Sequence, residues 1–168
     1  MLEKKITSNK KFSNENLERR YFYLDLHGKY FHPSKAESET KLILYDKLEP
    51  KEPIYFLSKH HPEYGKPSKY GNAIIQPPIN IKNQIKWLLK TLDKYYTILN
   101  KLGVTKIIFW EVCYLLPETQ RNFELDSDEM EILSTYKTSF CLSVYDLDLD
   151  NIESMSQRFH NNLYRNVK

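Results

Sequence analysis

The sequence is poor in the residues and motifs on which most enzyme classes depend. Its four glycines are scattered, so no glycine-rich phosphate-binding loop can be built from them. No CxxC, HExxH or GxSxG pattern occurs among the 168 residues. These absences exclude the large motif-defined enzyme classes, and we expect no catalytic residue, no metal site and no cofactor.

Cysteine and long apolar runs are also scarce. Cys113 and Cys141 each lie inside an apolar strand pattern, which predicts buried thiols rather than a disulfide or a metal site. The first residues, MLEKKITSNKKF, carry charge but no apolar core, so we expect neither a signal peptide nor a membrane anchor. The expected location is the cytoplasm.

The length of 168 residues predicts a single domain. Residues 1–16 are polar and without periodicity, and we expect a flexible arm there. Residues 47–79 are expected to form a long excursion, because six of the eight prolines lie in this stretch. Loops of this length are usually functional or mobile, which makes the excursion a candidate contact surface.

An amphipathic helix followed directly by an apolar strand organises the predicted fold. Apolar residues recur at steps of three and four from Ile81 to Leu102, and Asn80 and Gly103 are expected to cap this helix. Residues 106–116, KIIFWEVCYLL, are apolar on both faces except at Glu111, which predicts a strand in the middle of a sheet.

Shorter elements flank this pair. Alternation predicts strands at Tyr21–His27, Gln120–Leu125 and Ser139–Leu147, with a further short edge strand at Ile54–Leu57. The turn at Pro117 predicts that residues 106–116 and 120–125 form a hairpin.

Three further helices are predicted. One starts at Pro33 and runs towards Leu44, with Lys41–Tyr45 as an alternative short strand. Asp126 and Glu129 have the spacing of a capping box. A C-terminal amphipathic helix is marked by Ile152, Met155, Phe159 and Leu163. The expected fold class is α/β (α+β), a mostly antiparallel sheet of four to five strands with the long helix packed across it and shorter flanking helices.

Charge is distributed unevenly along the chain. Residues 1–116 hold 20 Lys and Arg against 12 Asp and Glu, residues 117–153 hold 2 against 10, and residues 154–168 hold 3 against none. An acidic segment gathered on one face would attract a basic partner and repel nucleic acid, whereas solvated charges would only neutralise basic neighbours. The candidate contact residues are the acids Asp126, Asp128, Glu129, Glu131, Asp146, Asp148 and Asp150 and the aromatic anchors Tyr64, Tyr70 and Tyr145.

Histidines form one possible constellation. Asp25, His27 and His32 near the first strand, with His60 and His61 in the excursion, are residue types that ligate zinc or transfer protons. Solvated histidines are common in such loops, so a chemical role is the less favoured interpretation.

Glu111 is the other unusual polar residue. A carboxylate in an apolar strand must be paired, exposed at the strand end, or functional. Lys106, Arg121 and His27 are the partners we expect.

Four stretches share a pattern with a known family. They are YFYLDL (21–26), LEP (48–50), IKWLLKTLDKYYTILNKLG (85–103) and QRNFELDSDEMEILSTYKTSFCLSVYD (120–146). The chain resembles a bacterial family of unknown-function domains that also occurs among immunity proteins of polymorphic and contact-dependent growth inhibition toxin systems. The resemblance implies a small α/β binding protein without assigned catalytic residues, so it transfers no site.

From this resemblance and the charge pattern we expect an immunity or antitoxin-like protein that covers the active site of a cognate toxin, with a nuclease as the candidate toxin class. The acidic stretch would mimic a nucleic-acid backbone before a basic toxin. The expected partner is therefore a basic protein, without membrane or nucleic acid.

The alternative is a nucleic-acid-binding protein or small hydrolase. It would use His27, His60 and Glu111 with the lysines of the first two thirds of the chain. Thirteen tyrosines and two tryptophans would supply aromatic surfaces on which bases stack.

Overall fold

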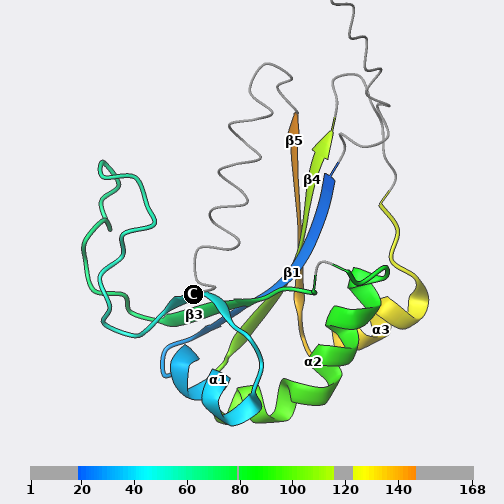
Figure 1. Ribbon diagram of the computed structural model, residues 1–168, viewed down its shortest axis with the longest axis horizontal. Helices are drawn as coiled ribbons and strands as arrows, with labels where there is room; N and C mark the ends of the chain where they lie inside the picture. The colour runs from blue at the N-terminus through cyan, green and yellow to red at the C-terminus, as the bar shows by residue number, and fades with distance from the viewer. Residues whose placement is uncertain (1–18, 79, 116–122, 147–168) are drawn as a thin grey trace, which may run out of the picture.

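A five-stranded mixed sheet with helices packed on one face forms the described part of the protein (Figure 1). The computed structural model describes residues 19–78, 80–115 and 123–146, so the predicted N-terminal arm and C-terminal helix lie outside the described residues. The elements are β1 (Arg19–Gly28), α1 (Pro33–Thr40), β2 (Tyr45–Leu48), β3 (Gly71–Ile75), α2 (Gln84–Lys101), β4 (Lys106–Leu115), α3 (Ser127–Thr135) and β5 (Ser139–Asp146).

The strand order is β2-β3-β1-β4-β5. The pairs β2–β3, β3–β1 and β1–β4 are antiparallel, whereas β4 and β5 are parallel. The predicted hairpin is wrong, because Phe123–Leu125 forms no strand and β4 pairs with β1 and β5. Parallel neighbours need a crossover connection, and α3 lies in the segment that connects β4 to β5.

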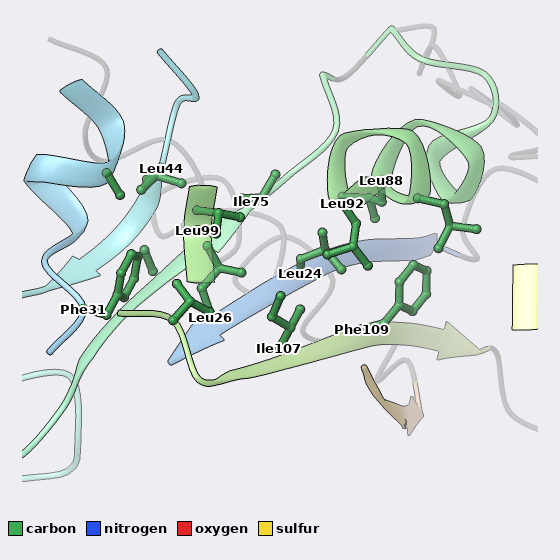
Figure 2. Close-up of a cluster of buried hydrophobic side chains, with 14 of the residues drawn as sticks. Leu24, Leu26, Phe31, Leu44, Ile75, Leu88, Leu92, Leu99, Ile107 and Phe109 are labelled. Carbon is green, nitrogen blue, oxygen red and sulfur yellow. The ribbon is translucent and has the colours of Figure 1, made fainter. Parts of the chain in front are cut away.

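The core lies between the inward face of the sheet and α2. Leu24 and Leu26 of β1 are fully buried and pair in register with Phe109 and Ile107 of β4. Figure 2 shows Leu92 of α2 directed towards these strands. The alternation of β1 therefore places one apolar row against the amphipathic stripe of α2, as the sequence predicts.

The long helix starts later than expected. Asn83, not Asn80, caps α2, and its side-chain oxygen accepts a hydrogen bond of 2.9 Å from the Lys86 amide. The helix has 18 residues and is about 27 Å long. Gly103 follows it with φ at 96°, and a Cβ there would lie 2.6 Å from the Tyr30 carbonyl oxygen.

The region between β1 and α2 contains two short strands. Helix α1 ends at Thr40, and the Lys41 backbone is left-handed with φ at 60°, so the chain leaves the helix before Leu44. Residues 41–44 form neither the predicted helix nor the alternative strand Lys41–Tyr45, and β2 begins only at Tyr45. Strand β3 was not predicted, and it lies between β2 and β1.

The excursion between β2 and β3 forms backbone hydrogen bonds within itself. The Ile54 amide donates to the Lys66 carbonyl at 3.0 Å, and the Gly65 amide donates to the Ile54 carbonyl at 2.7 Å. An isolated bridge joins Pro53 and Pro67. The strand predicted at Ile54–Leu57 is absent, because these bonds shape a loop of turns and bends instead.

Candidate partner-binding surface

Helix α3 and its N-cap residue together carry four of the predicted acidic residues. The Asp126 side chain accepts from the Glu129 amide at 2.8 Å, and the Glu129 carboxylate accepts from the Asp126 amide at 3.1 Å. This is the predicted capping box, so these two carboxylates help to start the helix. Asp128 and Glu131 are exposed and take no part in the cap, which leaves them available to a partner.

The acidic character extends beyond the helix. Residues 123–146 contain six Asp and Glu against one cation, Lys137. Asp146 is the last residue of β5, and Asp148 and Asp150 lie outside the described residues. The described acids therefore belong to one continuous segment, from the approach to α3 to the end of β5.

Strand β5 presents large apolar side chains at the edge of the sheet. Leu142 is 45% exposed, Val144 is 53% exposed and Tyr145 is 50% exposed, while Phe140 is 37% exposed. We call these four residues the β5 patch, in which Phe140, Leu142 and Val144 lie on one face of the sheet and Tyr145 lies on the opposite face. Figure 1 shows the upper parts of β4 and β5 extending beyond the helices, so no described helix covers this part of β5. Clustered exposed apolar side chains are typical of interaction sites.

An aromatic stack links the acidic helix to the β5 patch. The Phe123 and Phe140 rings are stacked with centroids 4.8 Å apart, and Phe140 also contacts Phe109 of the core. Phe123 lies three residues before Asp126. The segment that leads into α3 is therefore held beside the first part of β5.

The predicted aromatic anchors do not gather on this surface. Tyr145 belongs to the β5 patch and stacks on Tyr114, with ring centroids 5.3 Å apart. Tyr64 and Tyr70 lie in the excursion, which leaves the sheet at the opposite edge (Figure 1). Tyr64 packs edge-on against Tyr55 at 5.5 Å. Among the described candidates, Tyr64 and Tyr70 therefore lie apart from Tyr145 and the acids of α3.

Glu111 is paired with a residue that was not among the expected partners. It is fully buried, and its Oε1 atom lies 2.6 Å from Nε and 2.5 Å from Nη2 of Arg20. The Cys113 thiol donates to the same oxygen at 3.2 Å. Burial and this bond raise the pKa of Cys113 to about 11, so the thiol stays protonated at neutral pH.

The histidines do not converge on one site. The His27 Nε2 atom lies 2.8 Å from Asp25, and His32 lies 3.1 Å from Glu49, which also accepts from the first turn of α1 through the Ser34 amide. His60 and His61 are exposed in the excursion. Among the described residues no three His, Cys, Asp or Glu side chains are placed to hold a metal ion.

His27, His60 and Glu111, which the hydrolase alternative would use together, also do not lie at one site. Register pairs Phe22 with Glu111 and Leu24 with Phe109, so Glu111 lies on the helix-covered face of the sheet. His27 alternates with the buried Leu26 and lies on the other face. The geometry does not bring these side chains to a common substrate.

The comparisons add no assignment. No protein-family model matches the chain, and no curated protein or solved structure matches it. Within the described ranges no helix has the length and apolarity needed to cross a membrane.

Sequence reasoning missed two features of this region, the partner of Glu111 and the exposure of β5. The first is Arg20, which precedes the alternating stretch Tyr21–His27 and lies 91 residues from Glu111. The second is the exposure of Leu142 and Val144. A usable signal for the second was present, because the strand SFCLSVY contains neither proline nor a charged residue.

Proposed function

We propose that this protein is an immunity or antitoxin-like binding protein that neutralises a cognate bacterial toxin by occluding its active site. A basic nuclease is the toxin class that suits the charge of the surface best. The observations that support the proposal are the exposed acids of α3 and the exposed apolar residues of β5, two surface features of the continuous segment that runs from α3 into β5.

The acids of α3 and the apolar residues of β5 suit different steps of binding. Carboxylates such as Asp128 and Glu131 would steer a basic protein and speed its association. Apolar side chains on one face of β5, such as Leu142 and Val144, would then be desolvated against the partner and slow its dissociation. This division is typical of interfaces with a polar rim and an apolar centre.

Co-expression tests the proposed function. Cells would express the protein encoded by the neighbouring reading frame, with and without this chain, and their growth would be followed. We expect growth arrest by the neighbour alone and rescue by this chain, with both proteins recovered in one complex. If the neighbour is toxic and this chain gives no rescue, the inhibitor function is wrong.

A second candidate function rests on the excursion. Tyr55, Phe56 and Tyr70 are 65%, 70% and 55% exposed, and four exposed lysines lie in the same loop. Exposed aromatics interleaved with cations are typical of surfaces that stack single-stranded nucleic acid. The lysines are Lys51, Lys59, Lys66 and Lys69.

Titration with a fluorescent single-stranded RNA separates this candidate from the first. Nucleic-acid binding on the excursion predicts an affinity that falls steeply with salt and weakens in Phe56→Ala. Processing by a histidine predicts that His60→Ala removes activity. Absence of salt-sensitive binding would eliminate the second candidate without affecting the inhibitor proposal.

A further inference from the structure

The face of the sheet opposite the helices, which we call the outer face, is buried along β4. Side chains alternate along this strand, so Ile108, Val112 and Tyr114 lie on the face opposite to that of Phe109. They are only 9%, 8% and 5% exposed. Within the described ranges the helices that contribute to the core pack on the Phe109 side. These helices therefore do not account for the burial of the outer face.

Neighbouring strands cover only the flanks of these side chains. Tyr114 contacts Tyr21 of β1 edge-on with ring centroids 6.0 Å apart, and it stacks on Tyr145 of β5 at 5.3 Å. Side chains of a strand stand roughly perpendicular to the sheet, so rings beside Tyr114 leave its outer end open. Burial nevertheless raises the pKa of the Tyr114 phenol. The burial of Tyr114 therefore requires a further layer over β4.

Three stretches of more than one residue lie outside the described residues: 1–18, 116–122 and 147–168. Residues 1–18 are rich in lysine and lack helical or strand periodicity, and residues 116–122, LPETQRN, are mostly polar. Residues 147–168 differ from both, because their apolar side chains recur at the three- and four-residue steps of one helix face. These side chains are Ile152, Met155, Phe159 and Leu163.

We propose that residues 147–168 cover the outer face, with residues 152–163 as a helix that lies along β4. The chain leaves β5 after Asp146, whose register partner Leu115 is next to Tyr114. A helix over residues 152–163 would be about 18 Å long. The strand from Ile108 to Tyr114 spans about 20 Å. The apolar stripe therefore matches the buried row in length and starts near one of its ends.

This inference goes beyond the proposed function and does not depend on it. It assigns the outer face to the chain itself. The opposite face of β5, with Leu142 and Val144, would then be the part of the β5 patch that is open to a partner.

Methyl NMR of the full chain tests the contact directly. The chain has three methionines, so labelling of the methionine methyl carbons gives three signals, and Met155→Leu identifies the signal of Met155. We expect nuclear Overhauser effects between the Met155 methyl group and ring protons of Trp110 or Tyr114. Met130 is 53% exposed on α3 and is the internal control, without effects to the outer face.

Tryptophan fluorescence gives a second readout with matched variants. Trp110 lies on the outer face, where it stacks on Tyr23 at 6.1 Å, and Trp87→Phe leaves it as the only tryptophan. In this background Phe159→Asp places a charge in the proposed stripe and should increase acrylamide quenching of Trp110 roughly two-fold. Asn161→Asp adds the same charge on the other side of the proposed helix and should leave quenching unchanged. Thermal melting would verify that each variant is folded.

Three results would overturn the inference. One is the absence of Overhauser effects from Met155 to the outer face, which also decides the matter if Phe159→Asp does not fold. Another is equal quenching in the two folded variants. The third is a dimer in sedimentation with outer-face contacts only between differently labelled copies, which would assign this face to a second copy. Growth rescue in the co-expression assay would be unaffected by each of these results.

Discussion

Arg20 and Glu111 form a charged pair across neighbouring strands, with two guanidinium nitrogens within 2.6 Å of one buried carboxylate oxygen. Glu111 is fully buried, while the Arg20 side chain is 32% exposed and lies 5.1 Å from the centre of the Phe22 ring. In register Glu111 lies beside Leu142 of the β5 patch. The paired carboxylate therefore lies on the strand next to β5.

Removing Arg20 should destabilise the fold more than removing the pair. Arg20→Met leaves Glu111 buried without its cation, and we expect a loss of about 3 kcal/mol in the free energy of unfolding. Arg20→Met/Glu111→Leu should recover most of this loss, because no unpaired charge remains. Urea denaturation measures the free energy of unfolding of both variants. Equal stability of Arg20→Met and the wild type would show that the pair has little structural role.

The stripe of α2 gives a second stability prediction. Leu92 is fully buried between α2 and the sheet, so Leu92→Ala should cost about 2 to 5 kcal/mol. Lys90→Ala, at an exposed position of the same helix, should change stability by no more than about 0.5 kcal/mol. An unchanged melting temperature for Leu92→Ala would contradict the packing described here.

The capping box separates structural acids from contact acids. Asp126→Ala removes the oxygen that accepts from the Glu129 amide and should lower stability by about 1 kcal/mol. Glu131→Ala lies outside the cap and should be close to neutral. Thermal melting monitored by circular dichroism measures the difference, and equal effects of the two substitutions would refute the separate roles.

The two thiols should differ in reactivity. Cys113 is buried with its pKa raised to about 11, whereas Cys141 is half-buried on β5. At pH 8 iodoacetamide should alkylate Cys141 first, as followed by mass spectrometry of the folded protein. Because the folded pKa lies above the ordinary 9.0, the Cys113 contribution to stability is complete below pH 9 and is lost as the pH rises through 11. Preferential alkylation of Cys113 would contradict this assignment.

Strong periodicity explains which elements sequence reasoning found. The helix periodicity of α2, the alternation of β1 and β5 and the capping box of α3 are local patterns, and the structure confirms each with small changes in the ends. Strand β3 was missed because GNAII is short, begins with turn-forming residues and follows a proline-rich loop. Whether GNAII forms a strand depends on tertiary pairing, because β3 lies between β1 and β2 in the sheet.

The candidate surface was less predictable because it depends on contacts that are distant in sequence. Parallel pairing of β4 and β5 was not foreseen, since Pro117 favoured a hairpin. The same pairing makes β5 an edge strand and exposes Leu142 and Val144. The acids of α3 were identifiable from the sequence alone, whereas the exposure of the apolar residues of β5 became known only with the strand order.

The rate at which the neighbouring-frame protein associates with this chain measures steering by the acids of α3. Stopped-flow mixing at low and high salt would compare the wild type with Asp128→Lys/Glu131→Lys. The control, Glu39→Lys/Glu63→Lys, makes the same change in net charge at acids outside the surface that are 45% and 47% exposed. We expect the α3 variant to associate roughly 10-fold more slowly at low salt, with the difference shrinking at high salt, and the control to stay close to the wild type. Equal association rates for the wild type and the α3 variant, independent of salt, would contradict the claim that acidic α3 receives a basic partner.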